Sequence, residues 1–312
     1  MDLNPIVSVV KSSSHYEGVS DSLRLIERRI KEGLEGKRRV LIKPNFVSTR
    51  RQLSATHVDA VKAVLDIIRR HYSGKIVVGE GPAGSDLNTG LANYDYFKLQ
   101  DEYDVDFIDL NKDDYVEVEV RKSEKSTITK FHVSKTVVES DYRVSVALPK
   151  THDMVIVTLT IKNVVVGSLV GHKSRVHQGY TGINLNIAKL AQVVMPHLGV
   201  IDGFVGMEGR GPVSGDPVDL RAAAASVSPI SLDAVMTKIM GFNPYDIGYL
   251  YYLDEWNVGT IDLKEIEIVG TPIEEVSRRF EPHPRYRSML TWRNAQPTSG
   301  PLSGILRALG RA

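Results

Sequence analysis

Short apolar runs alternate with helical patterns along the first part of the chain. Residues 6–10, 40–42 and 76–78 are β-branched runs of strand length, and residues 57–70 carry apolar side chains at helical spacing. Strands that are apolar on both faces are typical of a buried parallel sheet. Because strands that alternate with helices pair in parallel through helical crossovers, this part of the chain predicts an α/β fold.

A different pattern begins after residue 105. Val116, Val118 and Val120 alternate with glutamates, and a second alternating run follows at residues 128–133, beyond a charged stretch at 121–126. Alternation with a period of two predicts strands with one buried face and one solvated face. We therefore expect an antiparallel β-hairpin inserted near residues 115–134.

The rest of the chain returns to buried strands and helices. The expected strands are residues 142–148, 199–201 and 266–269, and the expected helices are residues 186–194 and 232–240. These patterns predict a mainly parallel central sheet flanked by helices, in an α/β domain over residues 1–270 that forms either one unit or two lobes. Residues 271–312 are rich in Arg and Pro, and we expect them to form a C-terminal tail over the surface.

The composition excludes several classes of function. The 39 Lys and Arg residues are balanced by 38 Asp and Glu residues, so a net charge of +1 provides no overall attraction to nucleic acid or anionic lipid. The chain has no cysteine, which excludes disulfides, thiolate-bound zinc, iron–sulfur clusters and a cysteine nucleophile. No apolar run approaches the roughly 20 residues that span a bilayer, and the first residues do not resemble a secretion signal. We expect a cytoplasmic protein without a membrane partner.

Polar side chains gather where the predicted strands end. Lys43 and Asn45 flank a proline directly after a strand, and the carboxyl ends of parallel strands are where open α/β sheets bind ligands. A denser group of lysine, histidine and asparagine lies between residues 150 and 177, among apolar Val and Leu. Polar groups at the edge of a core need partners, and lysines there have lowered pKa values. This stretch therefore predicts anion binding and acid–base chemistry.

Candidate roles follow from the chemistry of these side chains. The candidate catalytic residues, as acid–base groups or oxyanion-stabilising donors, are Lys150, His152, Lys162 and His177. The candidate substrate-binding residues are Lys43, Asn45, Asn163, His172, Lys173, Gly209 and Gly211. A structural or surface role explains any single histidine more readily, and it is their clustering that favours function.

Three carboxylates lie near glycine-rich turns in the second half of the chain. Asp202 ends a predicted strand, Glu208 follows in a glycine-rich loop, and Asp233 lies inside an apolar helical stretch. Oxygen ligands of this kind hold Mg²⁺ or Mn²⁺ in many proteins, which makes these metals the candidate cofactors. The alternative is that Asp202 and Asp233 cap helices or pair with Lys150 and Lys162. The sequence leaves both interpretations open.

Six motifs, in this order, resemble those of the "domain of unknown function 362" (DUF362) family. They are Ile42-Lys43-Pro44-Asn45, Leu148-Pro149-Lys150-Thr151-His152, Thr158-Leu159-Thr160-Ile161-Lys162-Asn163, Val200-Ile201-Asp202-Gly203, Met207-Glu208-Gly209-Arg210-Gly211-Pro212 with Gly215, and Ser231-Leu232-Asp233-Ala234-Val235. The resemblance implies an α/β fold and an intracellular, largely prokaryotic protein, but no general activity. Many members carry a ferredoxin-like module with iron–sulfur clusters, and this cysteine-free chain departs from that pattern.

Two classes of function fit these observations. The first is an enzyme that acts on a small carboxylate- or phosphate-bearing metabolite, with ligation, isomerisation and hydrolysis all open. The second is a non-catalytic protein that binds a metabolite or single-stranded nucleic acid. Nucleic-acid binding would use basic and aromatic residues of the tail, namely Arg278, Arg279, Arg285, Arg287, Arg293, Tyr286 and Trp292. The near-zero net charge favours the enzyme.

Overall fold

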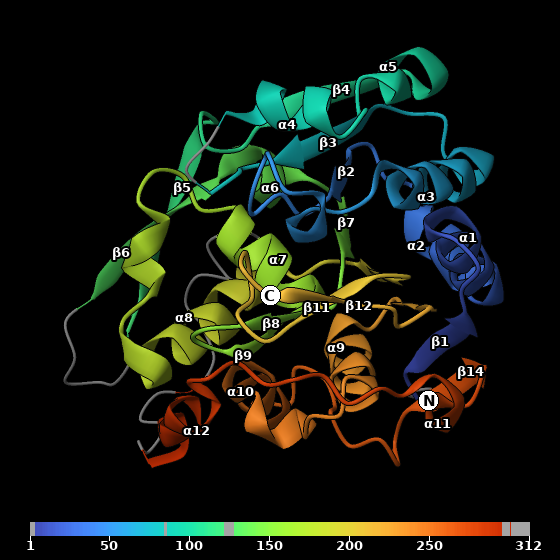
Figure 1. Ribbon diagram of the computed structural model, residues 1–312. Coiled ribbons are helices and arrows are strands. Elements are labelled where there is room, and N and C mark those ends of the chain that lie inside the picture. The colour runs from blue at the N-terminus through green and yellow to red at the C-terminus, as the bar shows by residue number, and fades with distance from the viewer. Residues whose placement is uncertain (1–3, 84–85, 122–127, 295–299, 301–312) are drawn as a thin grey trace.

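An eight-stranded sheet forms the centre of the protein (Figure 1). The structure is a computed structural model, and it describes residues 4–83, 86–121, 128–294 and 300. In spatial order the strands are β14 (Glu267–Gly270), β1 (Ile6–Lys11), β13 (Ala222–Ser226), β10 (Leu198–Gly203), β7 (Tyr142–Ala147), β2 (Val40–Lys43), β3 (Ile76–Glu80) and β4 (Val105–Asp109). β13 runs antiparallel to both of its neighbours, and the other pairs are parallel. The expectation of a mainly parallel sheet is confirmed.

Helices cover both faces of this sheet, as Figure 1 shows with α1 to α3 on one side and α7 to α9 on the other. The first face packs against α1 (His15–Leu25), α2 (Glu27–Leu34), α3 (Val58–His71), α4 (Leu87–Asn93) and α5 (Lys98–Tyr103). The second packs against α7 (Thr160–Gly167), α8 (Gly179–Val194), α9 (Pro229–Ile239) and α10 (Gly248–Glu255). Each face of the sheet has its own hydrophobic core, and alternate residues of a strand pack into one or the other. Val40 and Ile42 pack into the core on the first face, and Leu41 packs into the core on the second.

The expected hairpin is present. β5 (Tyr115–Val120) and β6 (Thr129–Ser134) pair antiparallel, with Val118 opposite Phe131. Both of these side chains are buried, while the glutamates of β5 lie on the other face. α6 (Lys135–Glu139) follows directly. Most of the charged stretch at 121–126 lies outside the described residues.

A second, smaller sheet carries part of the predicted chemistry. Its order is β12 (Asp216–Val218), β11 (Gly206–Glu208), β8 (Lys150–His152) and β9 (Ile156–Thr158). β8 pairs in parallel with β11 through Lys150 and Met207, and antiparallel with β9. This sheet fixes the backbone of Lys150 and His152 immediately beyond the end of β7.

Residues 271–294 pack against the body of the protein through buried side chains. This segment contains α11 (Ile273–Val276), α12 (Tyr286–Met289) and the 3₁₀ turn η4 (Leu290–Asn294); the other 3₁₀ turns are η1 (Gln52–Ser54), η2 (Lys173–Val176) and η3 (Pro244–Asp246). Trp292 is 3% exposed, and its ring N–H donates to the carbonyl of Asp246 at 2.8 Å. Tyr286 donates to the carboxylate of the same residue at 2.7 Å. Stacking on nucleic-acid bases requires free aromatic faces, and these two rings are instead part of the fold. Residues 295–299 and 301–312 of the expected tail lie outside the described residues.

Among the described residues, no helix combines the length and apolar character that a membrane span requires.

Candidate active site

Lys43 and Glu80 form a buried ion pair at the ends of two neighbouring parallel strands. The ammonium of Lys43 lies 2.6 Å from Glu80 Oε2 and donates at 3.0 Å to both Pro44 O and Asn163 Oδ1. Burial lowers the pKa of Lys43, and the charge of Glu80 opposes this shift. Since all three N–H donors are used within the protein, we assign Lys43 a positioning role in place of the anion contact expected from the sequence.

Asn163 joins four of the candidate residues in one network. Its Oδ1 accepts from Lys43 and, at 3.0 Å, from Asn45 Nδ2, while its own Nδ2 donates to Ser145 Oγ at 3.1 Å. Asn45 Oδ1 in turn accepts from the ammonium of Lys150. Lys43, Asn45, Lys150 and Asn163 therefore converge on one place, at the carboxyl ends of β2 and β7.

Lys150 is fully buried without a carboxylate partner among the described residues. It donates to Asn45 and, at 3.0 Å, to Ser54 O. Burial lowers its pKa well below the usual value, and the charge of Lys162 lowers it further. This environment favours the neutral amine, which has only two N–H donors, and both have acceptors. Lys150 thus fixes the orientation of Asn45.

A cavity of about 60 Å³ lies beside this network. Asn45, Asn163, Thr158, Lys162 and Lys173 all contribute to its lining. A single water requires roughly 10–15 Å³ of such space, so the cavity has room for a group of a few atoms. Its charged lining residues are Lys162, Lys173 and Glu80, and Glu80 is paired with Lys43.

Two polar groups of this cavity have no partner among the described residues. Lys162 is 7% exposed, and its ammonium makes no hydrogen bond or ion pair there. The hydroxyl of Thr158 is likewise buried without a partner. Burial lowers the pKa of Lys162 to about 8, while Asp153 opposes the shift and Lys43 adds to it. An unsatisfied cation and an unsatisfied hydroxyl are both costly to bury, and an anion in the cavity would give Lys162 a partner.

Lys173 and Gly167 complete the wall of the cavity. Lys173 donates to Gly81 O and, at 3.3 Å, to Gly167 O, and burial lowers its pKa to about 8. A Cβ on Gly167 would lie 2.1 Å from Lys43 Cε, so only glycine lets the end of α7 approach this closely. Lys173 therefore adds positive charge to the wall without being free of partners.

Three histidines interact with the charge of Asp153, namely His152, His177 and His283, and none of them lines the cavity. His152 is buried, and its Nδ1 lies 3.0 Å from the backbone nitrogen of Met154 and 3.2 Å from Asp153 Oδ1. Burial lowers its pKa well below the usual value, and the charges of Lys162 and His177 add to this. Burial also lowers the pKa of His177 and that of His283, and the charge of Asp153 opposes both shifts. The site thus offers neutral imidazoles near a cation, a combination that can move protons.

Four candidate substrate-binding residues lie outside the cavity lining, namely Lys43, described above, and His172, Gly209 and Gly211. His172 lines a separate hollow beside β6. Gly209 has a φ of +67° and donates to Glu281 O at 2.8 Å, so it forms a turn. A Cβ on Gly211 would lie 2.1 Å from Thr151 O, which gives this glycine a packing role.

The three candidate metal ligands do not come together. Asp202 Oδ2 lies 2.6 Å from His15 Nδ1, and Glu208 accepts from the backbone N–H of Glu281 at 2.8 Å. Asp233 accepts from the N–H groups of Thr160 and Ile161. Across the described residues, no group of three His, Asp or Glu side chains has the arrangement of a metal site. Of the alternatives left open by the sequence, Asp233 caps a helix, but Asp202 pairs with a histidine and not with a lysine.

Asp202 belongs to a separate cluster near the carboxyl end of β10. The rings of His15 and His57 stack with centroids 4.0 Å apart and an interplanar angle of 3°. His57 Nδ1 accepts from Asp59 N at 3.2 Å, and burial lowers the pKa of His57. The contact with His15 gives Asp202 a partner outside the lysine network.

Sequence patterns alone assign no role to Glu80, Thr158, Asp153 or His283. Asp153 and Thr158 stand in or beside the motifs that contain His152 and Lys162, so position in the motif could have indicated them. His283 lies more than a hundred residues away and reaches the site because Glu281 bonds to Glu208 and Gly209. Only the fold reveals that contact.

Comparison with known proteins identifies the family. The model of the family described as "Domain of unknown function (DUF362)" matches residues 40–238. The chain belongs to the DUF362 family. This confirms the resemblance seen in the six motifs, and the absence of cysteine sets the chain apart from members with iron–sulfur clusters.

Individual relatives of this DUF362 protein are distant. A thylakoid-associated protein, sll1697, from Synechocystis sp. (strain ATCC 27184 / PCC 6803 / Kazusa) is 26% identical over 77% of this chain and 76% of its own length. Two solved structures are similar: the lactate racemase apoprotein from Thermoanaerobacterium thermosaccharolyticum (16% identity, 74% of this chain, TM-score 0.47) and a protein from Thermotoga maritima (12%, 69%, TM-score 0.43). The chain aligns with 56% and 55% of these two structures, respectively.

Proposed function

We propose that this protein is an enzyme that acts on a small metabolite bearing a carboxylate or phosphate group, and that the anionic group binds at Lys162. One observation carries the proposal: the buried ammonium of Lys162 and the buried hydroxyl of Thr158 share a cavity and have no partner among the described residues. Each of these unsatisfied groups costs stability, and proteins commonly accept such a cost where it serves function.

The remaining residues have distinct roles in this proposal. Lys162 and Thr158 bind the anion, and Lys173 adds positive charge to the same wall. Lys43, Lys150, Asn45 and Asn163 hold the cavity open through their mutual hydrogen bonds. His152 and His177 are the groups that move a proton, because their pKa values are lowered by burial and by the nearby charge of Lys162.

The substitution Lys162→Met tests the anion-binding role. Methionine keeps most of the bulk of the side chain and removes the charge, so it breaks no ion pair and relieves a buried cation. We expect a variant at least as stable as the wild type in which inorganic phosphate and acetate no longer raise the melting temperature. Lys238→Met, on the exposed side of α9, is the matched control and should respond to both anions like the wild type.

Thr158→Val provides a second and independent readout. Valine is nearly isosteric and removes only the hydroxyl without a partner, so the variant should be about 1 kcal/mol more stable and should bind phosphate more weakly. Strong destabilisation of both variants with undiminished phosphate binding would show that Lys162 and Thr158 are structural and would overturn the proposal. Enzymatic turnover is then tested with small carboxylates and phosphate esters. His177→Gln is expected to lower the turnover rate more than the affinity for the substrate.

A further inference from the structure

Lys162 differs from the other buried lysines in having no partner. Among the described residues, the buried lysine side chains are Lys43, Lys150, Lys162 and Lys189. All of them except Lys162 donate to an acceptor within the fold, namely Glu80, Asn45 and Gly300, respectively. The nitrogen of Lys162 makes no such contact there, and the residue lines the cavity described above. A buried polar side chain of this kind indicates a ligand.

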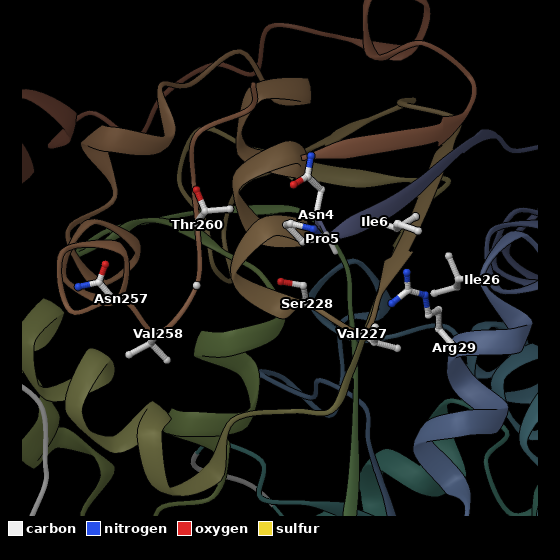
Figure 2. Close-up of a pocket in the computed structure, with 11 residues that line it drawn as sticks. Asn4, Pro5, Ile6, Ile26, Arg29, Val227, Ser228, Asn257, Val258 and Thr260 are labelled. Atoms are coloured by element: carbon white, nitrogen blue, oxygen red, sulfur yellow. The ribbon is translucent and has the colours of Figure 1, made fainter. Parts of the chain in front are cut away.

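A larger hollow, of about 670 Å³, differs from this cavity in its chemistry. Its lining includes Ile6, the first residue of β1, and Figure 2 shows Arg29 of α2 and Ser228 beside it. Arg29 is partly exposed, so water solvates its charge, and a guanidinium does not lose its proton in proteins. The described lining of this hollow therefore offers no nucleophilic nitrogen comparable to that of Lys162.

The surroundings of Lys162 favour the neutral amine over the ammonium. Burial lowers its pKa to about 8, the charge of Asp153 opposes this shift, and the charge of Lys43 adds to it. Lys162 in turn lowers the pKa of Lys150, so these cations disfavour one another. Burial and neighbouring cations are the two means by which proteins make a lysine nucleophilic. A lysine that only held an anion would gain from keeping its charge.

The rest of the cavity suits a short 2-oxo acid. An apolar wall for the carbon chain comes from Phe46, Val47, Ala83 and Val166. Lys173 uses two of the three N–H donors of its ammonium, toward Gly81 O and Gly167 O, and one remains for a carboxylate. At roughly 10–15 Å³ for each water-sized group, the cavity of about 60 Å³ holds about four to six heavy atoms. Glyoxylate and pyruvate have this size.

We propose that Lys162 forms an imine with a short 2-oxo acid whose carboxylate is held by Lys173, a role that rests on the proposed function because the substrate occupies the same cavity. The nitrogen of Lys162 bonds to the carbonyl carbon, and the carbonyl oxygen takes the two protons that leave the nitrogen. This oxygen departs as water, so an ammonium and a carbonyl give an iminium and water with atoms and charge conserved. The iminium withdraws electrons from the adjacent carbon, whose bonds are the ones that the enzyme makes or breaks.

Reductive trapping on the full chain tests the imine, with pyruvate as the probe and sodium cyanoborohydride as the reductant. Reduction turns the imine into a stable carboxyethyl-lysine, which peptide mass spectrometry locates. At pH 7 roughly a tenth of the Lys162 side chains are neutral, a fraction on the order of a hundredfold larger than for an exposed lysine. We expect Lys162 to be labelled at least about tenfold faster than Lys31 and Lys238, which are exposed.

Methyl pyruvate is the matched probe, because it has the same carbonyl and lacks the negative charge. Its labelling of Lys162, measured relative to that of Lys238, should be about tenfold weaker than with pyruvate, as expected for the loss of a charged hydrogen bond. Lys173→Met should weaken labelling by pyruvate to a similar degree, and Lys31→Met should leave it unchanged. Melting curves show whether each variant is folded, and if Lys173→Met is not, the two probes on the wild type decide.

The imine and the proposed function fail in different ways. The imine is overturned if Lys162 is labelled no faster than Lys31, or if pyruvate and methyl pyruvate label Lys162 equally relative to Lys238. Phosphate and acetate form no imine, so stabilisation of the wild type by these anions without selective labelling would support the anion site and overturn the imine. If both are correct, saturating phosphate should protect Lys162 from pyruvate.

Discussion

Asp233 on α9 caps the helix that carries Lys162. Its carboxylate accepts from the backbone N–H groups of Thr160 and Ile161, both at 3.0 Å, and from the hydroxyl of Thr160 at 2.5 Å. These groups form the first turn of α7, two residues before Lys162. The carboxylate thus satisfies backbone donors that the helix itself cannot, and it fixes the position from which Lys162 reaches the cavity.

This capping predicts an unusual dependence of stability on pH. Burial raises the pKa of Asp233 to about 7, although its hydrogen bonds to Thr160 and Ile161 act in the opposite direction. An unfolded aspartate has a pKa of about 3.9, so between pH 4 and 7 the folded state binds more protons and the contribution of Asp233 to stability falls as the pH rises. The gap in unfolding free energy between wild type and Asp233→Asn should narrow across this range by up to roughly 4 kcal/mol. Urea denaturation at several pH values measures the gap, and a constant gap would contradict the assigned pKa.

At higher pH, the contribution of Lys162 to stability should change with pH in the opposite direction. Its folded pKa of about 8 lies below that of an unfolded lysine, about 10.4, so between these values the unfolded state binds more protons and stability rises with pH. Below pH 8 the buried charge costs up to roughly 3 kcal/mol, which Lys162→Met removes. The variant should therefore be more stable than the wild type at pH 7, with the difference vanishing near pH 10. Saturating phosphate should move this transition to higher pH, since a bound anion favours the charged lysine; the same curve with and without phosphate would argue against an anion at Lys162.

The periodicity of the chain was enough to predict most of the central sheet. Strands such as β2 and β3 are short β-branched runs between amphipathic helices, so local pattern and tertiary structure agree. β13 could not be found in this way because four of its five residues are alanine, which favours helix. Its small side chains suit a central strand against which α1 packs closely, and Gly18 lies near Ala223 for the same reason. Tertiary packing determines that these residues form a strand, and intrinsic strand propensity does not include that packing.

The sequence was enough to predict where the candidate site lies, but not which role each of its residues has. Lys43, Lys150 and Lys162 lie close together because each stands at or just after a strand or motif on one side of the fold. The positions of these strands and motifs can be recognised in the sequence. Whether a lysine forms an ion pair depends on residues far along the chain. Glu80 forms an ion pair with Lys43, while no carboxylate of the described residues forms one with Lys162. Pairing across such separations has no local signal.

Divalent metal ions are expected to leave the protein unchanged. Asp202, Glu208 and Asp233 each accept hydrogen bonds within the fold, from His15, Glu281 and the first turn of α7. Binding a metal would require breaking these contacts, so Mg²⁺ or Mn²⁺ at millimolar concentration should not raise the melting temperature, and a chelator should not lower it. A rise with Mg²⁺ that disappears in Asp202→Asn would restore the metal site expected from the sequence.

The ion pair of Lys43 and Glu80 predicts strong coupling between two substitutions. Both side chains are almost fully buried, so Lys43→Met leaves a carboxylate without its cation, and Glu80→Gln leaves a cation without its carboxylate. Each single variant should lose roughly 3–5 kcal/mol of unfolding free energy. The double variant removes both charges and retains uncharged neighbours for Asn163, so it should lose much less than the sum of the two. A double-mutant cycle from urea denaturation measures the difference, and additive losses would show that the pair contributes no coupling. Lys43 does not line the cavity and contacts two residues that do, Asn163 and Glu80. The double variant should therefore retain phosphate binding at Lys162 if Lys43 has a positioning role and makes no direct contact with the anion.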